Sequence, residues 1–143
     1  MSQILSSIVQ SADGIAAVTG TLQQVVTLAL PPGQWIVDGE GWINITSGTP
    51  AMQLVAAVLS LNALGSTIEP KFDEASNIIT LAMSASTKAT AGFALPVNSM
   101  YVISEANNTA ILGIRADWTG TGTLNLYGMV TARRQDVPMY LPA

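Results

Sequence analysis

The sequence contains no cysteine and no histidine, and each absence excludes a class of chemistry. Without cysteine the chain can form no disulfide bond and has no thiol nucleophile. Without histidine as well, zinc sites and the usual nucleophile–base pairs of hydrolytic enzymes cannot be assembled. We therefore expect that the protein is not an enzyme and that it binds no cofactor and no metal ion.

Charged side chains are also scarce, at 10% of the 143 residues against about 25% in an ordinary soluble domain. The formal net charge is −4, and the five Lys and Arg residues form no basic stripe, so we expect no nucleic-acid partner. Hydrophobic residues make up 49% of the chain, and the mean hydropathy is +0.43. A soluble monomer with this balance would expose more apolar surface than such proteins tolerate. We therefore expect part of the surface to be buried against other chains.

No apolar run reaches the roughly 18 consecutive residues that a membrane-spanning helix requires. The best candidate, from Ala51 to Leu64, is interrupted by Gln53, Ser60 and Asn62. The first residues have neither the basic region nor the apolar core of a secretion signal. We expect no membrane partner, and burial between subunits is the preferred explanation of the apolar excess.

Apolar and polar residues alternate along much of the chain, as in strands with one buried face. In 34–46 the odd positions include Trp35, Val37 and Ile43, whereas the even positions are largely polar apart from Ile36 and Trp42. Similar alternation recurs over 78–83, 89–95, 110–118 and 124–132. Because Ile36 and Trp42 point away from the expected core, they are our first candidates for a subunit contact.

One stretch, from Met52 to Leu61, is apolar at odd and even positions alike, so we expect this strand to be covered on both faces. Turn signals separate the runs, at Pro31-Pro32-Gly33, Ser47 to Pro50, Asn107-Asn108 and Thr119 to Gly122. At Asn107-Asn108 we expect a tight hairpin with positive φ angles. About eight strands with little room for helix predict an all-β antiparallel sandwich or barrel.

These patterns divide the chain into an N-terminal arm (1–24), a β-sandwich domain (25–134) and a C-terminal tail (135–143). The arm holds four aliphatic residues at helical spacing, so a short helix and an extended arm are both possible: Ile4, Leu5, Ile8 and Val9. The tail carries Met139 and Tyr140 between two prolines, which cannot continue a sheet centrally. We expect both ends to lie on a partner.

Some carboxylates could take part in chemistry or metal binding. Asp38 and Glu40 lie two apart on one strand face, about 7 Å from each other, a separation that could suit a glycosidase pair. We favour a simpler role, in which they keep a solvent-facing strand soluble. Three further acids could bind calcium, but they lack the spacing of a calcium loop, so we expect a solvated loop: Glu69, Asp73 and Glu74.

Arg115 and Asp117 share one face of a strand, and Arg133 flanks the next strand. The simplest interpretation is a cross-strand ion pair. The alternative is that these residues bridge subunits at a three-fold axis and fix their register.

Two stretches carry a resemblance to a known family. LALPPGQWIVDGEGWINI, near the start, and LPVNSMYVISEANNTAILGIRADWTGTGTLNLYGMVTARR, near the end, resemble small all-β virion structural proteins of tailed bacteriophages. The resemblance covers Val25 to Arg134, and it implies a jelly-roll-like sandwich that associates as a trimer on the virion. It also implies that Gly33 forms the first turn, that Trp35 packs beneath it, and that Tyr127-Gly128 lies near the subunit interface.

We therefore predict a homotrimeric capsid decoration (cement) protein, made in the host cytoplasm, that stabilises a bacteriophage head. It would lie on the outer surface of the capsid and bind the major capsid protein. The alternative is a tail-fibre or receptor-binding module that recognises host glycans through Trp42 with Asp38, Glu40 and Asn44. The candidates for subunit or capsid contact are Ile4, Leu5, Ile8, Val9, Ile36, Trp42, Arg115, Tyr127, Met129, Arg133, Met139 and Tyr140.

Overall fold

The computed structural model describes residues 3–64, 76–82 and 93–135, and this part of the chain is built almost entirely from β-strands. The strands are β1 (Ile4–Val9), β2 (Ile15–Ala16), β3 (Leu22–Leu30), β4 (Gly33–Gly48), β5 (Ala51–Leu61), β6 (Ser76–Ala82), β7 (Phe93–Ser104), β8 (Asn108–Thr119) and β9 (Gly122–Arg134). A single 3₁₀ turn, η1 (Ser11–Asp13), follows β1. In these residues no helix has the length and apolar character needed to cross a membrane.

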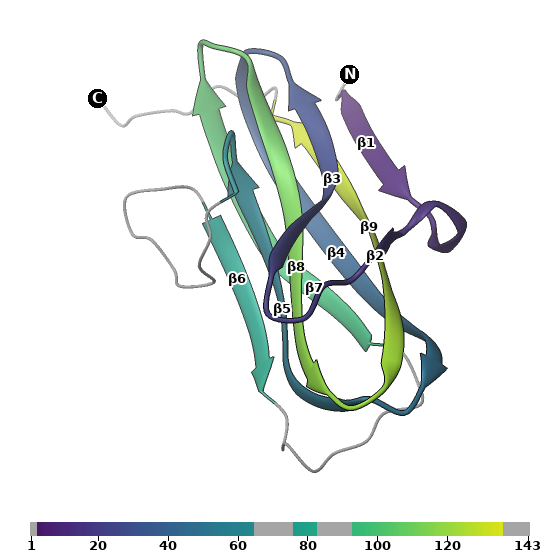
Figure 1. Ribbon diagram of the computed structural model, residues 1–143. Helices are drawn as coiled ribbons and strands as arrows, with labels where there is room; N and C mark the ends of the chain where they lie inside the picture. The colour runs from purple at the N-terminus through teal and green to yellow at the C-terminus, as the bar shows by residue number, and fades with distance from the viewer. Residues whose placement is uncertain (1–2, 65–75, 83–92, 136–143) are drawn as a thin grey trace.

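The strands form two antiparallel sheets that pack face to face (Figure 1). The β4 sheet has the order β1-β9-β4-β7, with β2 also paired to β9, and the β5 sheet has the order β3-β8-β5-β6. The pairs β1–β9, β3–β8, β4–β7 and β5–β6 therefore form one long hairpin that is wound into two layers. This winding is that of a jelly roll, so the predicted all-β, jelly-roll-like sandwich is confirmed.

Most connections cross from one sheet to the other, which corrects the expectation of a tight hairpin at Asn107-Asn108. β7 lies in the β4 sheet and β8 in the β5 sheet, so the segment between them spans two layers about 10 Å apart. Among the described residues Asn62, with φ of 65°, is the one non-glycine residue with a positive φ. A crossing connection does not need the mirror-image turn that joins neighbouring strands.

The alternation in the sequence determines which side of each strand is buried. Along β4 the odd positions Trp35, Val37 and Ile43 are buried in the core, and the even positions are half-buried on the outer side, as predicted. Trp35 is 1% exposed, as the family resemblance implies, and its indole Nε1 donates a hydrogen bond to the carbonyl oxygen of Pro31 at 2.9 Å. This bond satisfies the buried indole and fixes the turn that leads into β4.

The prediction that residues 52–61 are covered on both faces is confirmed for residues 55–60, whereas Gln53 is exposed. Val55, Ala57 and Leu59 belong to the core between the sheets. On the opposite face, Val58 is the cross-strand partner of Gly113, and the Leu64 side chain lies where a side chain on Gly113 would be. The segment that follows β5 thus covers part of the outer face of the β5 sheet.

The N-terminal segment is a strand, so the helical alternative for residues 4–9 is wrong. β1 pairs along its whole length with β9 of its own chain, and Leu5 and Val9 pack against the core. Ile4 and Ile8 occupy the other face of the strand and are exposed. Aliphatic residues at positions 4, 5, 8 and 9 fit a helix face, but they also give each side of a strand two aliphatic residues.

Two glycines of the β4 sheet leave no room for a side chain of their own. A methyl group on Gly128 would lie 2.5 Å from Leu112 Cδ2 and 2.8 Å from the carbonyl oxygen of Glu40. A methyl group on Gly41 would lie 2.7 Å from Ile114 Cδ1. These glycines leave room for the large side chains of β8, which fill the centre of the sandwich.

We expect Gly128→Ala to lower the free energy of unfolding by about 1–3 kcal/mol, because the added methyl group would displace both a core side chain and a strand backbone. Gly39→Ala is the matched control, because its methyl group would meet Leu112 and Leu59 at an ordinary 3.4 Å. Urea unfolding measures both changes. Equal stability of the two variants would contradict the close approach at Gly128.

Candidate functional site

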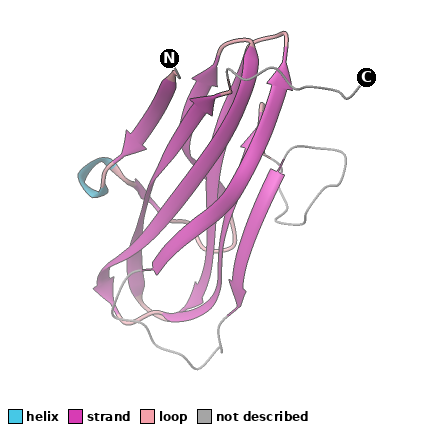
Figure 2. Cartoon of the chain, turned by 180° about the vertical axis from the view of Figure 1, so that it is seen from behind, coloured by secondary structure: helices cyan, strands magenta, loops and turns pink. Residues whose placement is uncertain are grey.

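The outer face of the β4 sheet, which points away from the β5 sheet, gathers apolar side chains from four strands. Figure 2 shows the strands of the sandwich from the side opposite to that of Figure 1. Cross-strand register places Ile4 of β1 opposite Arg133 of β9, and Arg133 opposite Ile36 of β4. Ile36 in turn lies opposite Tyr101 of β7. One row across the whole sheet is therefore apolar apart from a single guanidinium.

Large exposed apolar residues are concentrated on this face. Ile4, Ile8, Tyr101 and Ile103 are 64%, 57%, 69% and 64% exposed, and all four lie on the outer side of the β4 sheet. In the part of the chain that the structure describes, the other exposed residue of this kind is Val18, at 57%, which lies before β3. We call Ile36, Tyr101 and Ile103, with Arg133 beside them, the exposed patch.

An aromatic pair lies further along the same face. Trp42 of β4 is the cross-strand partner of Tyr127 of β9, and the two rings stack with centroids 5.6 Å apart and planes 14° from parallel. Both residues are half-buried. Met129 and Ile8 lie in the adjacent row, and the polar row of Ser6, Thr131 and Asp38 separates that row from the exposed patch.

The acidic residues of this face are few. The Ser99 hydroxyl donates a hydrogen bond to Asp38 Oδ1, and Glu40 lies between Met129 and Pro96 of the neighbouring strands. In the described residues no three or more Asp and Glu side chains group as they would to hold a metal ion. Glu69, Asp73 and Glu74, the loop acids, lie outside these residues.

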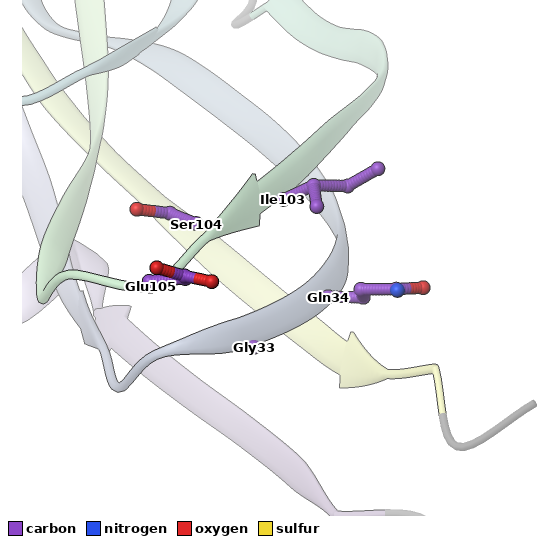
Figure 3. Close-up of a pocket in the computed structure, with 5 residues that line it drawn as sticks. All are labelled: Gly33, Gln34, Ile103, Ser104 and Glu105. Atoms are coloured by element: carbon purple, nitrogen blue, oxygen red, sulfur yellow. The ribbon is translucent and has the colours of Figure 1, made fainter. Parts of the chain in front are cut away.

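A shallow hollow of about 340 Å³ lies at one end of the sheet, lined by Gly33, Gln34, Ile103, Ser104 and Glu105 (Figure 3). It lies where β4 begins and β7 ends, because Gly33 is the partner of Ser104 and Gln34 of Ile103. In Figure 3 Gln34 and Ile103 extend to the same side of the two strands. The hollow therefore borders the exposed patch.

The structure brings most of the predicted contact residues together and separates a few. The outer face of the β4 sheet holds Ile4, Ile8, Ile36, Trp42, Tyr127, Met129 and Arg133. Leu5 and Val9 turn toward the core instead. Met139 and Tyr140 lie outside the described residues.

The prediction of a cross-strand ion pair at Arg115 is wrong. Arg115 lies on β8 of the β5 sheet, whereas Arg133 lies on β9 of the β4 sheet. Arg115 binds Asp117 of its own strand, with Nε donating to Oδ1 at 2.9 Å and Nη2 to Oδ2 at 3.1 Å. This hydrogen bonding raises the pKa of the Arg115 guanidinium above its usual value. Residues two apart on a strand share a face, so the short link within one strand forms readily.

Sequence reasoning missed Tyr101 and Ile103 as surface residues. Met100 and Val102, between them, are apolar as well and are buried. In this half of β7 both faces of the strand are therefore apolar in the sequence, so alternation cannot tell which face is buried. The hydrogen-bond register of β4 with β7 also shifts between Val37 and Gly39, which breaks the count from the start of the strand.

Two adjacent arginines at the end of β9 have different surroundings. Arg134 lies with its guanidinium carbon 5.4 Å from the centroid of the Trp35 ring, and its Nη2 donates to the carbonyl oxygen of Pro32 at 3.0 Å. Arg133 points to the outer face and is exposed. Arg134 thus belongs to the structure of the fold, and Arg133 to its surface.

We expect Arg134→Ala to lower the free energy of unfolding by about 1–2 kcal/mol, since it removes a charged hydrogen bond and a cation–π contact. Arg133→Ala, the matched control, should change it by less than about 0.5 kcal/mol. Chemical unfolding of both variants under conditions that keep them monomeric provides the comparison. A larger loss for Arg133→Ala would show that these roles are reversed.

No protein-family model and no curated protein matches the sequence. Solved structures with a similar fold include chains of infectious bursal disease virus. A chain of the Gx strain structure matches with a TM-score of 0.50 at 14% identity, over 95% of this chain and 34% of that chain. A chain of the T13 viral particle matches with a TM-score of 0.53 at 12% identity, over 93% and 31%.

A chain of the VP2 subviral particle of the same virus matches with a TM-score of 0.50 at 12% identity, over 93% of this chain and 33% of that chain. The present chain therefore spans about a third of the length of the viral chains that it matches. At these identities the likeness concerns the fold.

Proposed function

We propose that this chain is a virion structural protein, and that it acts as a homotrimeric decoration (cement) protein on the outer surface of a bacteriophage head, bound to the major capsid protein. The observation that carries the proposal is the outer face of the β4 sheet, where Ile4, Ile8, Tyr101 and Ile103 are all more than half exposed. The likeness to chains of viral particles supports a role in a virion. The sequence resemblance supports the bacteriophage and the trimer.

The mechanism is burial of this face against other subunits. Complete burial of an exposed Ile, Tyr or similar side chain contributes about 1.5–3 kcal/mol, and several such residues lie on this face. Few charges must lose water when the face is covered, chiefly those of Arg133, Asp38 and Glu40, and Asp38 already has a hydrogen-bond partner in Ser99. Such a surface favours association with little electrostatic cost.

A double substitution on the outer face tests the association. Ile36→Ser with Tyr101→Ser should raise the dissociation constant of the oligomer by at least about 100-fold, because two anchors lose their apolar surface. Light scattering across a concentration series measures this. Val18→Ser is the control, since it removes an aliphatic side chain that is 57% exposed and lies before β3, and it should leave association unchanged.

The unsubstituted protein should scatter light as a trimer. A monomer at all accessible concentrations would contradict the proposed function. Unchanged association of the double variant would instead show that subunits meet through another surface.

The glycan-binding alternative has one supporting observation, which is the half-buried Trp42–Tyr127 pair beside Asn44 and Asn125 in the next row. Aromatic rings next to amides are suitable for binding sugars, but here each ring already has one face against the other. This packing favours a subunit or capsid contact.

We expect Trp42→Ala to weaken binding to emptied phage capsids by about 10-fold, as the loss of an aromatic anchor does at other interfaces. The same variant should leave binding to host cells at its background level. Co-sedimentation with capsids and with cells measures both, with Val18→Ser as the control. Specific cell binding by the unsubstituted protein that Trp42→Ala abolishes would favour the receptor-binding module.

A further inference from the structure

The C-terminal tail leaves the sandwich next to the exposed patch. The last backbone hydrogen bonds of β9 and its continuation run from the Arg134 amide to the Gln3 carbonyl and from the Gln135 amide to the Gln34 carbonyl, both at 2.9 Å. Gln34 is the cross-strand partner of Ile103, which borders the hollow. The tail therefore begins at the end of the sheet where the most exposed apolar side chains of β7 lie.

The tail sequence matches the chemistry of the exposed patch. Residues 136–143 read DVPMYLPA, in which Asp136 is the one charged side chain. The exposed patch contains one charge of the opposite sign, on Arg133, among Ile36, Tyr101 and Ile103. An apolar segment with one acid thus complements an apolar surface with one base.

The two prolines in the tail determine how it can bind. Pro138 and Pro142 have no backbone amide hydrogen, and they hold the residues before them in extended conformations. The tail is therefore unsuited to adding a complete strand to a sheet edge. Contacts through the side chains of Met139 and Tyr140 are the mode of binding that remains.

The direction of β9 favours binding of the tail to the exposed patch of a neighbouring copy rather than to the exposed patch of its own chain. Ile36 lies opposite Arg133, and Gln34, the partner of Ile103, binds the Gln135 amide, so the chain has reached the end of its own exposed patch when it leaves the sheet. To return, it would have to reverse at Asp136-Val137, where Pro138 favours an extended backbone. Continued outward, residues 136–143 could span on the order of 25 Å, which reaches an adjacent subunit.

We propose that residues 136–143 of one copy dock on the exposed patch of a neighbouring copy, with Met139 and Tyr140 as anchors over Tyr101 and Ile103. This inference rests on the proposed association of copies, and it names the segment that makes part of that contact. Each subunit then gives a tail to one neighbour and receives one from another, which is the head-to-tail exchange that a closed ring requires.

The absence of cysteine makes a direct test possible. The double variant Ile103→Cys with Tyr140→Cys is oxidised as a full-length protein and analysed on a non-reducing denaturing gel. We expect disulfide-linked dimers and trimers that return to monomers on reduction. The double variant Val18→Cys with Tyr140→Cys is the matched control, and it should remain largely monomeric because Val18 is equally exposed but lies off this face.

Each alternative gives its own outcome. Loss of free thiols without a larger species would show that the tail folds back on its own chain, and it would overturn the exchange. An absence of disulfides in a protein that light scattering shows to be oligomeric would overturn tail docking and leave the proposed function standing. A monomer by light scattering would contradict the proposed function itself.

A second variant avoids any effect of introduced thiols. Met139→Ser with Tyr140→Ser should raise the dissociation constant of the oligomer at least 10-fold and leave the thermal unfolding of the monomer unchanged. Unchanged association would overturn the docking of the tail.

Discussion

The whole structure depends on the face-to-face contact of two sheets through every second side chain. Trp35, Val37 and Ile43 of β4 project into the same layer as Leu112 and Ile114 of β8, and all are buried. The layer can close because Gly41 and Gly128 leave space for the side chains of β8. Since the side-chain period of a strand is two, a slip of one residue would turn these side chains outward. The buried face thus also determines which residues the outer face presents.

The two outer faces differ because the chain covers them differently. On the β5 sheet, Ala56 and Val58 point away from the core and are nevertheless buried, and Leu64 lies against Gly113 of the next strand. On the β4 sheet the equivalent positions of the described chain hold Ile4, Ile8, Tyr101 and Ile103, which remain mostly exposed. In the part of the chain that the structure describes, large exposed apolar side chains are therefore concentrated on one side of the sandwich.

Much of the core could be predicted from the sequence, because strict alternation in β4 separates Trp35 from Ile36 and Ile43 from Trp42 without any knowledge of the fold. The connections could not. Asn107-Asn108 has the composition of a hairpin turn, but turn-forming residues serve equally well where a chain crosses between layers. Only the pairing of β7 with β4, and of β8 with β3 and β5, decides between these cases.

The candidate surface was predictable to a similar extent. Ile36 and Trp42 stand out as apolar residues on a polar strand face, whereas Tyr101 and Ile103 are hidden among apolar neighbours of both parities. Arg115 shows the opposite problem, since its charge suggests a distant partner and the geometry supplies Asp117 two residues away. The sequence can predict which charged residues pair across strands only when it is known to which sheet each strand belongs.

The few arginines that the structure describes differ in whether they have a partner within the fold. Arg134 lies over the Trp35 ring, and Arg115 binds Asp117. Each of these two arginines therefore has a partner within the fold. Arg133 instead stands in an apolar row between Ile4 and Ile36. A lone guanidinium on an apolar face adds little affinity while it remains in water, but it excludes any covering segment that does not bring an acceptor to it. In the proposed association, the apolar area of the outer face provides the driving force, and the guanidinium of Arg133 restricts which surfaces can cover it.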